Sequence, residues 1–157
     1  MITSLLLTGC SFHLKHNDGL VDKFPEIYIK TGSPRGELTR LIKLRLRGAN
    51  IKILTASSPN AAILKLGGEQ RSSRTISLYA TALSAEEEIG YIMNYSLIMP
   101  NNEEKQFSVN IYRDFLGDSS KALAKSRETE LITKELRVIA ADHVIASMLS
   151  IKTEAVE

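Results

Sequence analysis

Residues 115–151 read FLGDSSKALAKSRETELITKELRVIAADHVIASMLSI, and the rest of the chain is interpreted around this stretch. From Asp118 to Leu149 it contains neither proline nor glycine, and it begins Asp-Ser-Ser, residues that favour the start of a helix. A run of this length is too long for a strand. We therefore predict one long helix here.

The apolar residues of this predicted helix fall on two stripes. At about 100° per residue, the first stripe contains Leu131, Val138, Ile145 and Leu149, and the second contains Ile132, Leu136 and Ile139, with Glu135 and Asp142 between them. One stripe is enough to cover a sheet. The other either lies within the protein's own core or covers a further surface, such as that of a partner protein.

Alternation of apolar and polar residues predicts strands before this helix. The expected strands are 24–30, 51–54, 62–66, 75–80, 88–99 and 107–115. The last two are joined by Pro-Asn-Asn at 100–102, which predicts a hairpin. Gly67 and Gly68 permit a bend, after which 75–80 continues the strand before them.

A second helix is expected to begin at Ser33-Pro34 and to end at Gly48 to Asn50. Its apolar face contains Leu38, Leu41, Ile42, Leu46 and Ala49, and its basic face contains Arg40, Lys43 and Arg47. The element order is then strand, helix, four strands, helix. We predict the α+β class: a two-layer sandwich with a mostly antiparallel sheet and two helices on one face.

The composition agrees with one folded domain. The chain has 157 residues, of which 43% are hydrophobic and 24% charged, so a real core is expected. A formal net charge of +2 is too small to imply nucleic acid or membrane by itself. Tryptophan is absent and aromatic residues are few, so there is no obvious platform for stacking bases. No apolar run is as long as a membrane-spanning helix.

The sequence contains no recognisable catalytic motif. His143 stands alone on the long predicted helix, and His13 and His16 lack a third metal ligand. We therefore expect no enzymatic activity, no metal and no cofactor. The basic face of the second helix leaves an alternative function, a small domain that binds nucleic acid or another polyanion.

The single cysteine, Cys10, excludes a disulfide within the chain. Residues 7–10 (Leu-Thr-Gly-Cys) follow a short apolar run and resemble the lipobox of bacterial lipoproteins. The resemblance implies that 1–9 are a signal peptide and that Cys10 carries the lipid. Signal peptides begin with positive charge, which 1–9 lack, so we expect this signal peptide to be shortened at its start. Residues 10–157 are then a single domain with a lipidated tether. The alternative is an incidental cysteine near a terminus.

Further segments resemble the LptE family of lipopolysaccharide-assembly lipoproteins, also known as the RlpB family. They are Ser11-Phe12-His13-Leu14, the Gly-x-Pro-x-Gly-x-Leu pattern at 32–38, Arg113-Asp114-Phe115, Ala-Leu-Ala-Lys at 122–125, and then Glu128, Glu130, Leu131, Ile132, Lys134 and Glu135. The resemblance extends over essentially the whole chain in element order, and its specific motifs lie at the two ends.

The resemblance implies a non-catalytic outer-membrane lipoprotein. Members of the family plug the large β-barrel LptD, bind lipopolysaccharide and assist its assembly in the outer leaflet. This chain would be held on the periplasmic side of the outer membrane by the lipid on Cys10. Ser11, where an aspartate would favour inner-membrane retention in enterobacterial lipoproteins, agrees with that location. No nucleic-acid partner is implied.

The resemblance also implies lipopolysaccharide-binding residues. The family's contact lysine corresponds to Lys125, whose ammonium suits a lipid A phosphate, and Lys121 would project from the same helix face. We expect Lys125 to be solvated and to contribute little to folding. A second basic contact of the family lies on the strand before the hairpin, but residues 77–85 hold no lysine or arginine. Arg71 or Arg74 is the nearest substitute.

Overall fold

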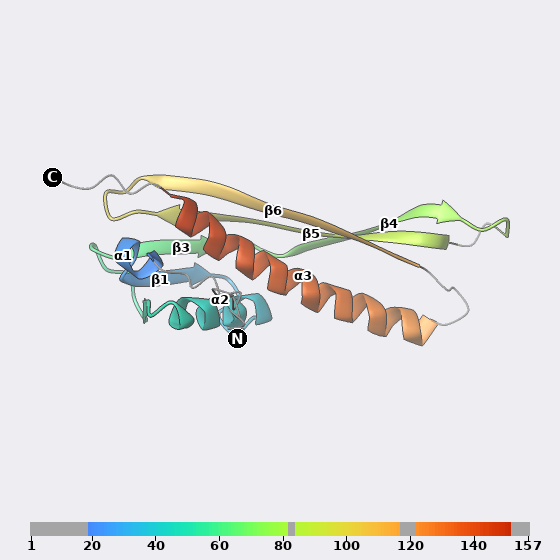
Figure 1. Cartoon of the computed structure of the whole chain (residues 1–157), viewed down its shortest axis with the longest axis horizontal. Helices are drawn as coiled ribbons and strands as arrows, with labels where there is room; N and C mark the ends of the chain where they lie inside the picture. Colours follow the sequence, from blue (N-terminus) through green and yellow to red (C-terminus); the bar gives the residue numbers. More distant parts are fainter. Residues whose placement is uncertain (1–18, 82–83, 117–121, 152–157) are drawn as a thin grey trace, which may run out of the picture.

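The computed structural model describes residues 19–81, 84–116 and 122–151. Its elements are α1 (Leu20–Lys23), β1 (Glu26–Thr31), α2 (Glu37–Gly48), β2 (Lys52–Leu54), β3 (Ala62–Leu66), β4 (Gln70–Leu78), β5 (Ser84–Ile98), β6 (Glu104–Leu116) and α3 (Ala122–Ser150). Figure 1 shows an elongated molecule in which the helices lie along one side of a long sheet. The predicted α+β class is confirmed, with α2 and α3 on one face and the short α1 as an addition.

The sheet is mixed. β1 lies between β2 and β3, β3 and β4 pair with one edge of β5, and β6 pairs with the other edge. β1 pairs in parallel with both β2 and β3, because α2 and the loop after β2 each return the chain to the same end of the sheet. The pairings of β5 with β3, β4 and β6 are antiparallel, and β5 with β6 forms the expected hairpin.

β5 pairs with three other strands, β3, β4 and β6. β3 and β4 pair with successive stretches of one edge, and β6 follows the whole of the other edge. The predicted bend between β3 and β4 lies at Gly67, whose backbone N–H donates to the carbonyl oxygen of Asn94 at 2.9 Å. A Cβ at Gly67 would lie 2.5 Å from that oxygen, so a side chain there requires the backbone to shift.

Beyond β3 the sheet narrows to three strands, which project from the body of the molecule (Figure 1). We call this projection the arm: residues 70–78, 84–92 and 110–116, with the first half of α3, residues 122–136, beside them. The face of the sheet covered by helices is the inner face. Odd-numbered residues of β5 lie on it, as their continuous burial from 87 to 97 shows.

One core joins the inner face to the helices. Its most deeply buried side chains include Ile27, Leu64, Tyr91, Met93 and Leu97 from the sheet, Ile42 and Leu46 from α2, and Leu136, Val144 and Met148 from α3. The apolar face predicted for α2 therefore supplies this core, together with part of the apolar surface predicted for α3. The outer face of the sheet carries no helix, as Figure 1 shows for the described part of the chain.

The two apolar stripes of α3 have different environments. Ile132 and Leu136, from the second stripe, are buried, whereas Leu131 and Val138, from the first stripe, are 60% and 40% exposed. Ile145, further along the first stripe, is buried again. The buried side of the helix rotates along its length, because the first half lies on the arm and the second half also packs against α2. Leu131 and Val138 of the first stripe therefore lie outside the core, whereas Ile132, Leu136 and Ile145 lie within it.

The far end of α3 is fixed by α1. The Lys23 ammonium donates to the carbonyl oxygens of Leu149 at 2.5 Å and Ile151 at 2.8 Å. The last carbonyls of a helix have no partner within the helix, and a cation at this end also suits the helix dipole. The end of α3 in the body is thus held firmly, while its beginning lies at the end of the arm.

Candidate functional site

Lys125 lies in the first turns of α3 and points toward the inner face of the arm. Its ammonium donates a hydrogen bond to the carboxylate of Glu87 on β5. The Lys125 side chain is 34% exposed and that of Glu87 is 11% exposed. The expectation of a solvated lysine was therefore wrong, because the Lys125 ammonium is paired with the carboxylate of Glu87, a residue far away in the sequence.

Glu87 is a charged residue at an apolar position. It lies on the same face of β5 as Ile89 and Tyr91, where a charge is costly unless it is paired. The hydrogen bond from Lys125 lowers the pKa of the Glu87 carboxyl below its usual value and outweighs the opposing effect of burial. The hydroxyl groups of Ser84 and Ser73 contribute in the same direction. The carboxylate is consequently held ionised beside the lysine.

The outer face of the arm has its own ion pair. Arg74 of β4 donates to both oxygens of Glu88, with distances of 2.7 Å from Nε and 3.2 Å from Nη2. The pair borders an open hollow of about 240 Å³ that is also lined by Ser72 and Tyr112. Arg71 is exposed, and its register with Tyr91 puts it on the inner face. The two candidate substitutes for a second basic contact thus lie on opposite faces.

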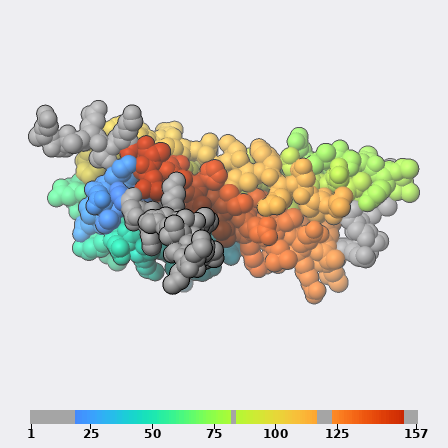
Figure 2. Space-filling model, viewed as in Figure 1, coloured from blue at the N-terminus to red at the C-terminus, as the bar shows by residue number. Residues whose placement is uncertain are grey.

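Large apolar side chains are exposed around the arm. They are Ile76, Leu78, Tyr79, Tyr112, Leu116, Leu123, Leu131 and, just beyond it, Val138. Leu123, two residues before Lys125, is 81% exposed. Figure 2 shows the first half of α3, in orange, along one side of the arm. Apart from Leu44, all the exposed large apolar side chains of the described chain thus lie in or beside the arm.

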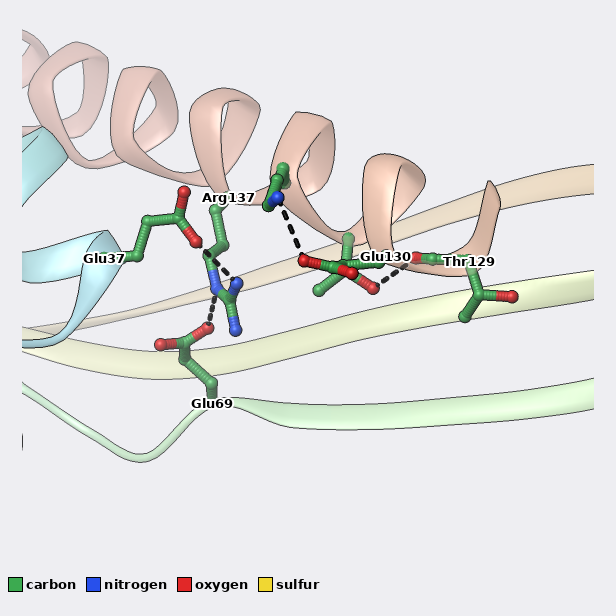
Figure 3. A network of polar contacts seen from close by, with 7 residues as sticks. Glu37, Glu69, Thr129, Glu130 and Arg137 are labelled. Atoms are coloured by element: carbon green, nitrogen blue, oxygen red, sulfur yellow. Dashed lines mark hydrogen bonds and ion pairs between the residues drawn. The ribbon is translucent and has the colours of Figure 1, made fainter. Parts of the chain in front are cut away.

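Arg137 connects the arm to the body (Figure 3). From α3 its Nη1 donates to Glu37 at 2.9 Å, and its Nε donates to Glu69 at 2.6 Å. Glu37 is the first residue of α2, and Glu69 lies in the bend between β3 and β4. Two carboxylates outweigh the effect of burial and raise the pKa of the guanidinium. One side chain therefore fixes three elements where the arm leaves the body.

Tyr91 lies beside this cluster. Its side chain is fully buried, and its hydroxyl makes no hydrogen bond of normal geometry within the described residues. Burial, followed by the negative charge of Glu69, raises the pKa of Tyr91. The hydroxyl therefore stays neutral next to the Arg137 network.

Known proteins share this sequence and this architecture. The family model described as LptE, lipopolysaccharide-assembly, matches residues 24–148. The chain belongs to the LptE family. An LPS-assembly lipoprotein LptE of Photorhabdus laumondii is 29% identical over 147 residues, which cover 94% of this chain and 81% of that protein.

Two solved structures are similar to the whole arrangement. The rare lipoprotein B of Shewanella oneidensis is 38% identical, with a TM-score of 0.75 over 80% of this chain and 94% of the other. A minor lipoprotein of Acinetobacter baumannii is only 8% identical but has a TM-score of 0.65 over 81% of this chain and 92% of the other. The second similarity shows the fold alone.

Within the described residues, the LptE-like motifs lie in two separate places, and Ser11-Phe12-His13-Leu14 lies outside those residues. The pattern at 32–38 forms the entry to α2 and supplies Glu37 to the Arg137 cluster. Residues 113–115 end β6 and residues 122–125 begin α3, so both lie in the arm. The motifs that resemble the LptE family thus lie where the arm meets the body and at the far end of the arm.

Several other predicted residues are placed elsewhere. Arg40 and Arg47 are exposed on α2, and the neighbouring Lys43 donates weakly to the carbonyl of Pro34 at 3.4 Å. His143 is exposed on α3 and therefore is not enclosed in a site. Cys10, Lys121, His13 and His16 lie outside the described residues, so their predicted roles stay predictions.

A separate hollow of about 540 Å³ lies on the outer face of the sheet, lined by Lys65, Asn94, Ser96, Glu104 and Gln106 among others. It is open, its lining also includes Leu66, Tyr95 and Phe107, and it is not lined by Lys125 or its neighbours. Within 19–81, 84–116 and 122–151, no group of three or more metal-ligating side chains is present. No helix in those ranges is long and apolar enough to cross a membrane.

Glu87 and Arg137 were not predicted from the sequence as residues of the site or of the connection between arm and body. Glu87 had a detectable signal, because it continues the alternation of Ile89, Tyr91 and Met93 and so places a charge in an apolar register. Arg137 had none, because a single arginine on a helix is ordinarily solvated. Its two partners come from segments 68 and 100 residues away in the sequence.

Proposed function

We propose that this chain is an outer-membrane lipoprotein that binds lipopolysaccharide and assists its assembly in the outer leaflet. It is anchored by a lipid on Cys10, after removal of 1–9, and it plugs an LptD-type β-barrel from the periplasmic side. Membership of the LptE family supports the assembly role. The chain performs no catalysis in this function, and its contribution is binding and placement.

The observation that carries the proposal is the combination of charges and apolar side chains in the arm. Lipopolysaccharide combines phosphate groups with acyl chains. Lys125 supplies a cation at the start of α3, and Leu123 and Leu116 expose apolar surface on other faces of the same end of the arm. Lys121, four residues earlier in the sequence, is the second proposed contact. An ammonium is a point-charge partner for a phosphate.

The barrel partner accounts for a second feature. Leu131 and Val138 are exposed on α3 although both are apolar. The outer face of the sheet is likewise free of helices in the described chain (Figure 1). We infer that contact with the barrel covers part of this surface, because a plug is surrounded by the wall of its barrel.

Replacing Lys125 with glutamine is expected to weaken binding of purified lipopolysaccharide by about tenfold. A hydrogen bond to a charged group contributes roughly 1.5–3 kcal/mol, and the lower end applies because Lys125 must first leave Glu87. Glutamine is used because an aspartate would place a second carboxylate beside Glu87 and disturb folding. The affinity can be measured by equilibrium titration, with thermal melting of the same sample.

Arg47→Gln on α2 is the matched control. It removes one positive charge at a distance from the arm, so it reports the effect of net charge alone. We expect it to change the affinity less than twofold, since exposed charges are screened over about 8–10 Å. An unchanged affinity for Lys125→Gln, or an equal loss in both variants, contradicts the assignment of Lys125.

A further inference from the structure

Before any ligand arrives, the Lys125 ammonium already has an anionic partner. It donates its hydrogen bond to Glu87, whose carboxylate is held ionised. An incoming phosphate therefore meets a lysine that is not free. Binding is an exchange of one anion for another, and its strength depends on the anion that is displaced.

The two partners differ in their freedom to move. Glu87 lies in β5 between two neighbouring strands, where it is in register with Thr75 of β4 and Phe115 of β6. Its side chain is largely covered. The Lys125 ammonium lies at the end of a flexible four-carbon chain on a helix surface, and this side chain is one-third exposed. The lysine can turn outward to a ligand while the carboxylate stays in place.

We propose that Glu87 is a resident anion that competes with lipopolysaccharide phosphate for Lys125 and so determines which anions the arm binds. This inference rests on the proposed role of Lys125 in the binding of lipopolysaccharide. A ligand gains affinity at this point only if its interaction with the ammonium exceeds that of the carboxylate already present.

The competition favours phosphate over weaker anions. A phosphate monoester carries a charge of about −1.5 to −2 near neutral pH and offers three acceptor oxygens. A ligand carboxylate carries a single charge, like Glu87 itself. Replacing Glu87 with such a ligand at Lys125 therefore adds little binding free energy. Glu87 thus allows phosphorylated lipids to bind and discriminates against singly charged amphiphiles.

The adjacent residue supplies a matched control. Glu88 has the same side chain and the same charge, but it lies on the outer face of β5 and is held by Arg74. Replacing either glutamate with glutamine changes the net charge equally. Only Glu87→Gln releases Lys125.

The experiment compares the wild-type protein, Glu87→Gln and Glu88→Gln in equilibrium titrations with purified lipopolysaccharide and with lipopolysaccharide from which the phosphates have been removed. We expect Glu87→Gln to bind the phosphorylated form about three- to fivefold more tightly, the upper part of the range for releasing one partly exposed ion pair. Glu88→Gln should stay within about twofold of wild type, since Arg74 and not Lys125 is its partner. The dephosphorylated form should not distinguish the three proteins.

The direction of the change decides the outcome. Unchanged or weaker binding by Glu87→Gln, in a protein where Lys125→Gln still weakens binding, overturns the competition and makes Glu87 a residue that positions the lysine. If Lys125→Gln also leaves binding unchanged, the proposed site itself is wrong. Should Glu87→Gln fail to melt cooperatively, Glu87→Asp replaces it: its shorter side chain withdraws the carboxylate, and tighter binding is again the expected result.

Discussion

Replacing Leu136 with alanine is expected to lower the free energy of unfolding by about 2–5 kcal/mol. Leu136 is 1% exposed and lies where α3 packs on the inner face of the sheet. Truncation removes buried apolar surface and leaves a cavity that a sheet with fixed register cannot close. Urea denaturation followed by circular dichroism measures the loss as a lower midpoint at an unchanged slope.

The control is the same substitution five residues earlier. Leu131 lies on the same helix but is 60% exposed, so Leu131→Ala should change stability by no more than about 0.5 kcal/mol. This pair of variants tests the rotation of the buried face along α3. A loss at Leu131 as large as that at Leu136 would show that both stripes are buried and that the first half of α3 is packed differently.

Replacing Arg137 with alanine is expected to lower the free energy of unfolding by about 2–4 kcal/mol. The loss leaves Glu37 and Glu69 close together without a cation, in a region where all three side chains are mostly covered. Breaking a buried ion pair by removing one partner is costly, because the remaining charge has lost its compensation. Thermal melting and urea denaturation at neutral pH measure the effect.

Arg113→Ala provides the comparison. Arg113 also forms an ion pair with a glutamate, Glu135, but the separation is 3.6 Å and both side chains are at least half exposed. Exposed pairs contribute about 0–1 kcal/mol. Similar losses in the two variants would mean that Arg137 is not a structural connection between arm and body. A loss confined to Arg137→Ala agrees with Figure 3.

Much of the fold could be predicted because its signals are local. The alternation in β5 and β6, the Pro-Asn-Asn turn between them and the uninterrupted length of α3 are all properties of neighbouring residues. The bend at Gly67 was predicted for the same reason. The element boundaries were less accurate: α2 begins at Glu37 rather than at Ser33-Pro34, because Gly36 is its N-cap.

The parallel pairing of β1 with β2 and β3 was not specified by any such signal. β2 has only three residues, and its alignment depends on where α2 delivers the chain. Likewise, the sequence of α3 shows two apolar stripes but not which of them the body covers. That choice depends on the contact with α2 over the second half of the helix.

The assignment of Lys125 as a binding residue stays a prediction, and the geometry around it could not be predicted from the sequence. Lys125 was identified through a family motif, and its position in the arm agrees with a role at that end of the molecule. Its pairing with Glu87 was missed, because the two residues are 38 positions apart and meet only when α3 lies on β5. A long-range ion pair of this kind follows from the packing and cannot be derived from helix periodicity.

Isolation of the native protein from its own cells tests most directly whether it works as an LptE-type component of the outer membrane. The full chain, tagged at its C-terminus, is extracted with detergent from separated membranes, and the proteins and lipids that copurify with it are identified. We predict recovery from the outer membrane, in equal amounts with one large β-barrel protein and with lipopolysaccharide bound. Recovery of the protein by itself, without such a barrel and outside the outer-membrane fraction, would contradict this function.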